Sequence, residues 1–203
     1  MKLTISPRHI KALLPLAGKD DARYYLNGIY IEANESQSRI VACNGVCLGV
    51  IRSEFGIDEA ESVTIIIPRH VAEVLSKLKT EFILEIGEKK NLGMERDCTA
   101  ISEKGPNVGF TSLDGEYPQW RKVVSFEQDV EAAPAQFAHK YLAAFAKTAK
   151  ALGESTGSIL IWQRGEDSAG VYVQCERDFF GVLMPLRDQY SRSGTPDWAV
   201  ETL

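Results

Sequence analysis

The chain has 203 residues, of which 44% are hydrophobic and 25% are charged, and this composition excludes a disordered chain. Its net charge of −5 argues against a protein that holds nucleic acid by a generally basic surface, although it leaves room for a local basic face. The start passes directly into a strand-like segment and no segment reaches the ~20 apolar residues of a membrane span, so we expect a cytoplasmic protein without membrane contact.

Residues 1–53 predict one βαβββ unit. A short strand precedes Ser6, which is placed to cap a helix that begins at Pro7, and Gly18 is placed to end that helix. Three apolar runs follow, and the second and third are joined by the tight-turn dipeptide Asn44-Gly45. We expect these strands near residues 24–32, 38–43 and 46–52.

The same order of elements recurs twice. Pro68-Arg69-His70 repeats the helix start Pro7-Arg8-His9 after 61 residues, and it again follows a strand. A third helix is expected at about 139–152, preceded by a strand that ends near Phe137. Three strands are expected to follow it, at 158–163, 170–175 and 179–186. Repeats of this length are typical of stacked or closed architectures in which each unit needs a neighbour.

The sequence contains no recognisable catalytic or metal-binding set. Its cysteines, at 43, 47, 98 and 175, form no Cys-x-x-Cys pair, and buried reduced thiols explain them better than a metal site or a disulfide. The three histidines lie at or next to helix starts, which favours solvated surface positions over a ligand set. We therefore predict no enzyme activity, no cofactor and no metal.

Positive charge is segregated on the predicted helices. Lys140, Lys147 and Lys150 cluster on one side of the third helix, which contains no acidic residue. One such stripe alone is usually a solvated helix face, but its recurrence on all three helices favours a surface that contacts DNA phosphates without regard to sequence. The other members of this predicted DNA-facing set are Arg8, Lys11, Arg69 and Lys77.

Several segments resemble the bacterial sliding clamp family, the beta subunit of DNA polymerase III. The segments 23–28 and 41–48 resemble the meander of that family's middle domain, and 64–69 resembles its second strand and helix start. The segment 114–123, Asp-Gly-Glu-Tyr-Pro-Gln-Trp-Arg-Lys-Val, resembles its closing segment, and 182–187 resembles the family's C-terminus. The resemblance covers most of residues 1–187.

The resemblance implies an α+β DNA-clamp fold, with repeated βαβββ units whose helices cover one face of antiparallel sheets. Members of the family close into rings around DNA, are not enzymes, and bind polymerases and repair proteins through short peptides. Carried over by motif, the peptide-binding pocket consists of apolar or amphipathic side chains suited to a Leu- or Phe-containing peptide. Its positions are Tyr25, Leu48, Pro118, Val123, Val182 and Met184.

The chain differs from the family in the number of units. The family has six βαβββ units in three domains, and this sequence has three, about one and a half clamp domains. We predict a complete domain at 1–124, built from units 1–53 and 62–124, then a half domain at 125–187 and a tail at 188–203. The family's Asp-Gly-His-Arg turn is replaced by residues 44–47, Asn-Gly-Val-Cys.

A half domain exposes a sheet edge, so we expect two half domains from different chains to pair. Four chains would then complete a ring of twelve units, and a tetramer is favoured over a trimer. Two functions remain open. One is a processivity clamp in DNA replication or repair that encircles duplex DNA as a homo-oligomeric ring and tethers polymerase or repair partners. The alternative is a non-encircling interaction module that competes for clamp-binding peptides.

Overall fold

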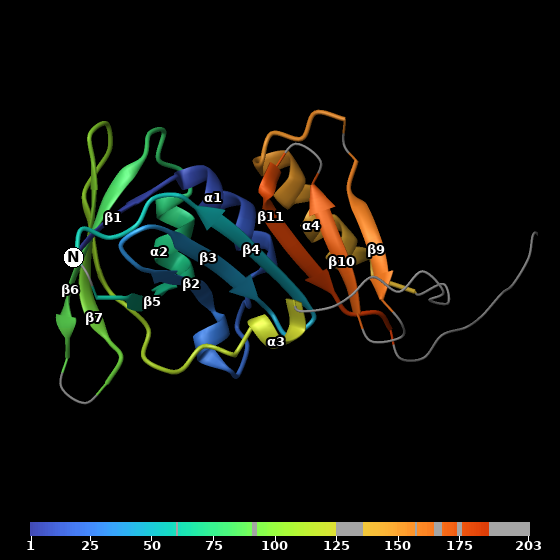
Figure 1. Ribbon diagram of the computed structural model, residues 1–203, viewed down its shortest axis with the longest axis horizontal. Helices are drawn as coiled ribbons and strands as arrows, with labels where there is room; N and C mark the ends of the chain where they lie inside the picture. The colour runs from blue at the N-terminus through green and yellow to red at the C-terminus, as the bar shows by residue number, and fades with distance from the viewer. Residues whose placement is uncertain are drawn as a thin grey trace, which may run out of the picture.

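A computed structural model describes residues 1–59, 61–90, 93–124, 136–156, 158–164, 168–173 and 176–186. Its elements form two antiparallel sheets with helices between and beside them (Figure 1). The strands are β1 (Lys2–Ile5), β2 (Gly28–Ala33), β3 (Ser38–Cys43), β4 (Cys47–Ser53), β5 (Val63–Pro68), β6 (Phe82–Lys89), β7 (Arg96–Ser102), β8 (Val108–Thr111), β9 (Leu160–Arg164), β10 (Ser168–Val173) and β11 (Glu176–Leu183). The α-helices are α1 (Pro7–Leu13), α2 (Arg69–Leu75), α3 (Arg121–Val124) and α4 (His139–Ala151), and 3₁₀ helices cover Leu14–Leu16 (η1) and Tyr24–Leu26 (η2).

The first two units exchange their first strands. The four-stranded sheet has the order β1-β6-β7-β8, so the first strand of unit one pairs with the second strand of unit two. The seven-stranded sheet begins β5-β2-β3-β4, so the first strand of unit two pairs with the second strand of unit one. Each unit therefore completes the sheet of the other.

The third unit extends the sheet of the first. Strand β11 pairs antiparallel with β4, and the sheet continues through β10 to β9, giving the order β5-β2-β3-β4-β11-β10-β9. In Figure 1 this sheet runs from the centre to the right, and the four-stranded sheet stands at the left. The confirmed fold class is thus α+β, with antiparallel sheets and few helices.

One face of the seven-stranded sheet is covered by the helices. Their apolar residues and the inward residues of both sheets make one continuous core, which includes Leu13 of α1, Leu75 of α2 and Phe145 of α4. Gly49 on β4 lies opposite Gly181 on β11, where the two units join. A Cβ atom at Gly49 would lie 2.5 Å from Leu16 Cδ1, and one at Gly181 would lie 2.5 Å from Phe145 Cε1. This glycine pair therefore lets η1 and α4 approach the sheet closely.

The predicted order of elements is confirmed for the first two units and for the helix and three strands of the third, with corrections at the boundaries. Helix α1 ends at Leu13 rather than near Gly18, because Pro15 lacks the N–H that would continue the helix, and the chain turns through η1 instead. Residues 24–26 form η2, and strand β2 begins only at Gly28. Ser6 occupies the N-cap position of α1 but makes no side-chain capping hydrogen bond.

Some predictions fall outside the described residues. They concern the tail at 188–203, Cys175 and the residues before Gln136. Gln136 and Phe137, expected at the end of a strand, are described and lie in no strand. The division into a complete domain at 1–124 and a half domain at 125–187 stays a prediction. In the described parts of the chain, we find no helix that is long and apolar enough to cross a membrane.

Candidate functional site

A second apolar cluster lies on the face of the seven-stranded sheet that the helices leave open. We call it the outer cluster; its buried residues are Leu26, Val41, Leu48, Val50, Ile66, Tyr117, Trp120 and Val182. It forms because strands β3 and β4 are apolar on both faces, so that Val41 and Val50 point away from the main core. The segment 113–124 covers it: the rings of Tyr117 and Tyr30 stack with centroids 4.5 Å apart.

A hollow of about 180 Å³, which we call the junction pocket, opens where β4 meets β11 and segment 113–124. Leu48 and Val182 lie opposite each other on the paired strands and form its floor. The Met184 N–H donates to the Val46 carbonyl at 3.0 Å, which fixes the chain just after β11 against the turn after β3. Met184 and Val123 line the pocket with 41% and 38% of their surfaces exposed, so they are available to a ligand.

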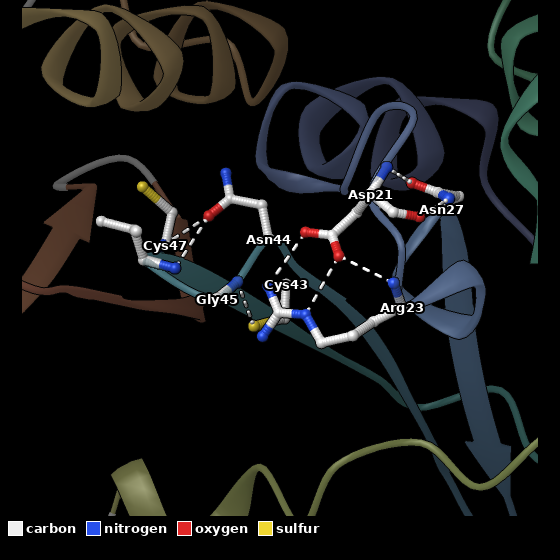
Figure 2. Close-up of polar contacts among 8 residues, drawn as sticks. Asp21, Arg23, Asn27, Cys43, Asn44, Gly45 and Cys47 are labelled. Carbon is white, nitrogen blue, oxygen red and sulfur yellow. Dashed lines mark hydrogen bonds and ion pairs between the residues drawn. The ribbon is translucent and has the colours of Figure 1, made fainter.

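The turn at 44–47 shapes one side of the junction pocket (Figure 2). Asn44 Oδ1 accepts hydrogen bonds from the N–H groups of Val46 at 3.0 Å and Cys47 at 2.8 Å, and Gly45 has φ +86°, which favours glycine. A Cβ atom at Gly45 would lie 2.6 Å from Arg23 Nη2. The turn is therefore compact because glycine lets the guanidinium of Arg23 lie directly against it.

Asp21 holds Arg23 at the rim of the pocket. Arg23 donates from Nε to Asp21 Oδ1 at 3.0 Å and from Nη2 to Asp21 Oδ2 at 2.9 Å (Figure 2). These hydrogen bonds lower the pKa of the Asp21 carboxyl to about 2, so the pair stays ionised throughout the neutral range. Asn27 in turn donates from Nδ2 to the Asp21 carbonyl at 2.8 Å. The pocket thus combines an apolar interior with one oriented cation at its rim.

The two cysteines beside the turn serve packing. Cys43 lies opposite Leu48 in the β3–β4 register and packs against the outer cluster, whereas Cys47 belongs to the main core on the other face. Because they lie on opposite faces of the sheet, they cannot form a disulfide without a change of register. Burial raises the pKa of the Cys47 thiol to about 12 and also raises that of Cys43. Cys98 is free as well.

The structure brings together five of the six predicted pocket residues. Leu48, Pro118, Val123, Val182 and Met184 all line the junction pocket. Tyr25 does not line it; its ring meets that of Tyr24 edge-on at 5.8 Å, and it packs against the outer cluster beside the pocket.

Sequence reasoning missed other pocket residues. Arg23, Val46 and Trp120 also line the hollow. Arg23 and Trp120 lie inside the segments 23–28 and 114–123 that resemble the family, but neither was among the positions carried over to the pocket.

Larger hollows lie elsewhere and are more polar in their lining. One, of about 380 Å³, borders the ion pair of Glu32 with Arg121. Another, of about 800 Å³, lies at the start of α1 and includes Arg8, Lys11 and Lys79. Neither contains a nucleophile held by a base, and among the described residues no three His, Cys, Asp or Glu side chains gather as metal ligands.

The predicted DNA-facing residues divide into two groups. Lys11, Lys77, Lys140, Lys147 and Lys150 are exposed on or beside the helices that cover the inner face of the sheets. Lys140 also lies over the ring of Tyr141, with its Nζ atom 4.7 Å from the centroid. These lysines remain open to a polyanion.

The two arginines of this set have structural contacts. Arg8 donates to the Leu152 carbonyl and pairs with Glu176 at 3.4 Å, so it connects α1 to the third unit. Arg69 donates to the carbonyls of Ala17 at 3.1 Å and Gly18 at 2.9 Å, and it pairs with Glu73. A phosphate would have to compete with these contacts.

The fold and the two surfaces define a clamp-type protein. The family described as DNA polymerase III beta subunit, central domain, matches residues 7–119, more than half of the chain. The chain belongs to this family, which confirms the resemblance found in the sequence.

Relatives with curated descriptions show the same extent. The chain is 31% identical over 108 residues to the beta sliding clamp of Vibrio cholerae, which covers 51% of this chain and 27% of the relative. It is 32% identical over 108 residues to the beta sliding clamp of Pseudomonas aeruginosa, and this match covers 52% of this chain and 28% of that relative. The matched part thus spans little more than a quarter of each relative's length.

Solved structures extend the likeness of fold to the third unit. The DNA polymerase III subunit beta of Pseudomonas aeruginosa superposes with a TM-score of 0.69 at 18% identity, over 92% of this chain and 66% of the other. The sliding clamp of Bacillus subtilis gives a TM-score of 0.69 at 14% identity, and the match covers 93% of this chain and 65% of the other. The chain therefore has the clamp fold over almost its whole length, and it spans just under two thirds of those chains.

Proposed function

We propose that this protein is a non-enzymatic processivity factor that encircles duplex DNA as an oligomeric ring and tethers polymerase or repair proteins through the junction pocket. The observation that carries the proposal is the separation of two surfaces on one fold. The exposed lysines lie on the helix layer, and the pocket lies on the opposite, outer face of the seven-stranded sheet. A partner held in the pocket would therefore leave the lysines free to contact DNA.

The helix layer suits DNA that slides. Lysine side chains contact phosphates as mobile point charges and carry no information about base sequence. The contacts are screened by salt and exchange easily, which allows movement along the duplex. The net charge of −5 leaves the outside of such a ring acidic, so DNA is favoured only in the hole.

The sheet topology supports ring closure. Units one and three join through their last strands, β4 and β11, in an antiparallel pair. The last strand of unit two, β8, stands at the end of its sheet, and a Cβ atom at Gly109 on this strand would meet nothing within 4 Å. A β8–β8 pair between two chains would repeat the β4–β11 junction about a twofold axis. Together with paired half domains, four chains would close a ring of six domains.

The native mass of the 203-residue protein tests this assembly. Four chains of 22.5 kDa give about 90 kDa, which we expect from light scattering across micromolar concentrations. A monomer at every concentration would contradict the ring. A stable trimer would contradict the pairing of half domains.

A non-encircling interaction module remains the second candidate. It is favoured by the fact that every residue lining the junction pocket comes from one chain, so peptide binding needs no ring. Such a module would bind a clamp-recognition peptide as a monomer or dimer and would show no retention on DNA. It would then compete with a complete clamp for the same peptides.

A further inference from the structure

We propose that the third unit pairs with the third unit of a second copy of this chain by reciprocal exchange, each copy adding the segment at Gln136 and Phe137, just before α4, to strand β9 of the other. The inference deepens the self-association proposed above and names the surfaces that make it. It rests on three features of the fold and on one likeness in the sequence.

The first observation is the exchange rule of the two complete units. Strand β1 pairs with β6, and β5 pairs with β2, so a first strand always joins the second strand of another unit. Strand β9 is the second strand of the third unit, and it stands at the end of the seven-stranded sheet in the described part of the chain. By this rule, the open side of β9 receives a first strand from elsewhere.

The second observation concerns the segment just before α4. In unit two, Ile66 is three residues before α2, and its carbonyl accepts the N–H of Leu113 at 2.9 Å, where the closing segment begins. In unit three, Gln136 is three residues before α4, and its carbonyl accepts the N–H of Leu186 at 2.8 Å. Gln136 and Leu186 are thus held together in the same way as Ile66 and Leu113.

This equivalence places Gln136 away from its own β9. Leu186 follows β11, and β11 is separated from β9 by β10, so the two outer strands are about 10 Å apart. In unit two, the pair of first strand and closing segment lies on the edge and outer face of unit one. The segment at Gln136, held by Leu186, is the corresponding part of unit three, and in the proposed exchange it would lie on the edge of a neighbouring unit.

The third observation is an apolar surface on the outer face of β9 and β10. Leu160, Trp162 and Tyr172 are 54%, 37% and 39% exposed, and Leu160 lies opposite Tyr172 in the register. They extend the outer cluster, whose corresponding part on β2 and β3 is covered by segment 113–124. Side chains of this size at a sheet edge indicate a surface that a partner covers.

The fourth observation is a sequence likeness between the covering segment and the tail. Leu113 and Tyr117 are four residues apart, as are Leu186 and Tyr190, and each tyrosine is followed by a Pro-x-Trp sequence. That sequence is 118–120 after Tyr117 and 196–198 after Tyr190, so the tail carries five extra residues. The sequence of the tail therefore resembles that of the segment that covers the outer cluster on β2 and β3.

The partner is a second copy because one unit carries both halves of the exchange. Among the described residues, the third unit offers an acceptor edge, β9, and also the segment at Gln136, held by Leu186, that corresponds to the donor of the complete units. Surfaces of this kind are self-complementary and pair about a twofold axis. The result is one complete clamp-like domain made from two chains.

A disulfide between chains tests the register directly. Ile66 lies opposite Tyr30 in the complete unit. Gln136 corresponds to Ile66 by the hydrogen bond that its carbonyl accepts, and we match Leu160 to Tyr30 because both lie on the outer face of the second strand of their unit. Directly opposed Cβ atoms on antiparallel strands are about 4.5 to 5.5 Å apart, close enough for a disulfide after small adjustment. We expect the double variant Gln136→Cys/Leu160→Cys to form covalent dimers on mild oxidation, with the two positions linked in peptide mass spectra.

The controls are the two single variants and the pair Gln136→Cys/Val74→Cys, because Val74 is equally exposed but lies on α2. These variants should give only background dimer. A protein that remains monomeric, or that dimerises without the 136–160 link, overturns the exchange. Crosslinked dimers that are not retained on DNA would support the exchange and contradict only the encircling function. Retention on DNA without the 136–160 link would support the encircling function and contradict the exchange.

Discussion

Met184→Ala is expected to weaken binding of a short Leu/Phe-containing peptide by on the order of tenfold or more, without a change in thermal stability. The side chain is partly exposed at the mouth of the junction pocket, so its loss leaves no cavity in the core but removes a contact surface for the peptide. A tenfold loss corresponds to about 1.4 kcal/mol of binding free energy. Fluorescence polarisation with a labelled synthetic peptide measures this directly.

Val74→Ala is the matched control, because Val74 is exposed to a similar degree on the other face of the molecule. It should leave the affinity for the peptide unchanged. Leu48→Asp is not a suitable test of peptide binding. Leu48 is buried in the outer cluster, where a carboxylate would destabilise the fold. If Met184→Ala and Val74→Ala bind equally well, the junction pocket is not the peptide site.

The triple substitution of Lys140, Lys147 and Lys150 by Glu is expected to abolish most association with duplex DNA. All three side chains are exposed on one side of α4, and none of them has a salt-bridge partner among the described residues. Loss of three phosphate contacts would reduce the slope of log affinity against log salt by up to about 2.7. Titrations of the wild type and the variant at several salt concentrations give both the affinity and the slope.

The control replaces three exposed lysines on other elements, Lys89, Lys104 and Lys122, by Glu. It makes the same change of net charge away from the helix layer. If the two triple variants lose equal affinity, the effect comes from overall charge, and the lysines of α4 are only a solvated face.

Local signals in the sequence predicted most of the fold. Two apolar runs and the Asn44-Gly45 turn between them predicted β3 and β4, and the two Pro-Arg-His helix starts predicted the repeat. The exchange of first strands between units was not predictable in this way. It depends on long-range pairing, such as Ile66 with Tyr30, and a period of two along a strand does not say which edge that strand will join.

The candidate site was predictable only through the resemblance to a family. The five apolar residues that line the junction pocket have the composition of ordinary core residues, and two of them, Leu48 and Val182, are in fact buried. The contribution of Arg23 depends on the positive φ of Gly45 and on two hydrogen bonds that Arg23 donates to Asp21, which are tertiary features. The contacts of Arg8 and Arg69 are tertiary features as well. The sequence predicted both arginines on a DNA-facing surface, but it could not show that they donate hydrogen bonds to backbone carbonyls.

Topological retention on DNA tests the central claim most directly. The protein can be threaded over the ends of a linear duplex, which is then ligated into a circle and passed through a gel-filtration column at a salt concentration that screens phosphate contacts. A closed ring predicts that the protein elutes with the circle and is released when the DNA is cut once. Equal loss of the protein from circular and cut DNA would contradict an encircling clamp.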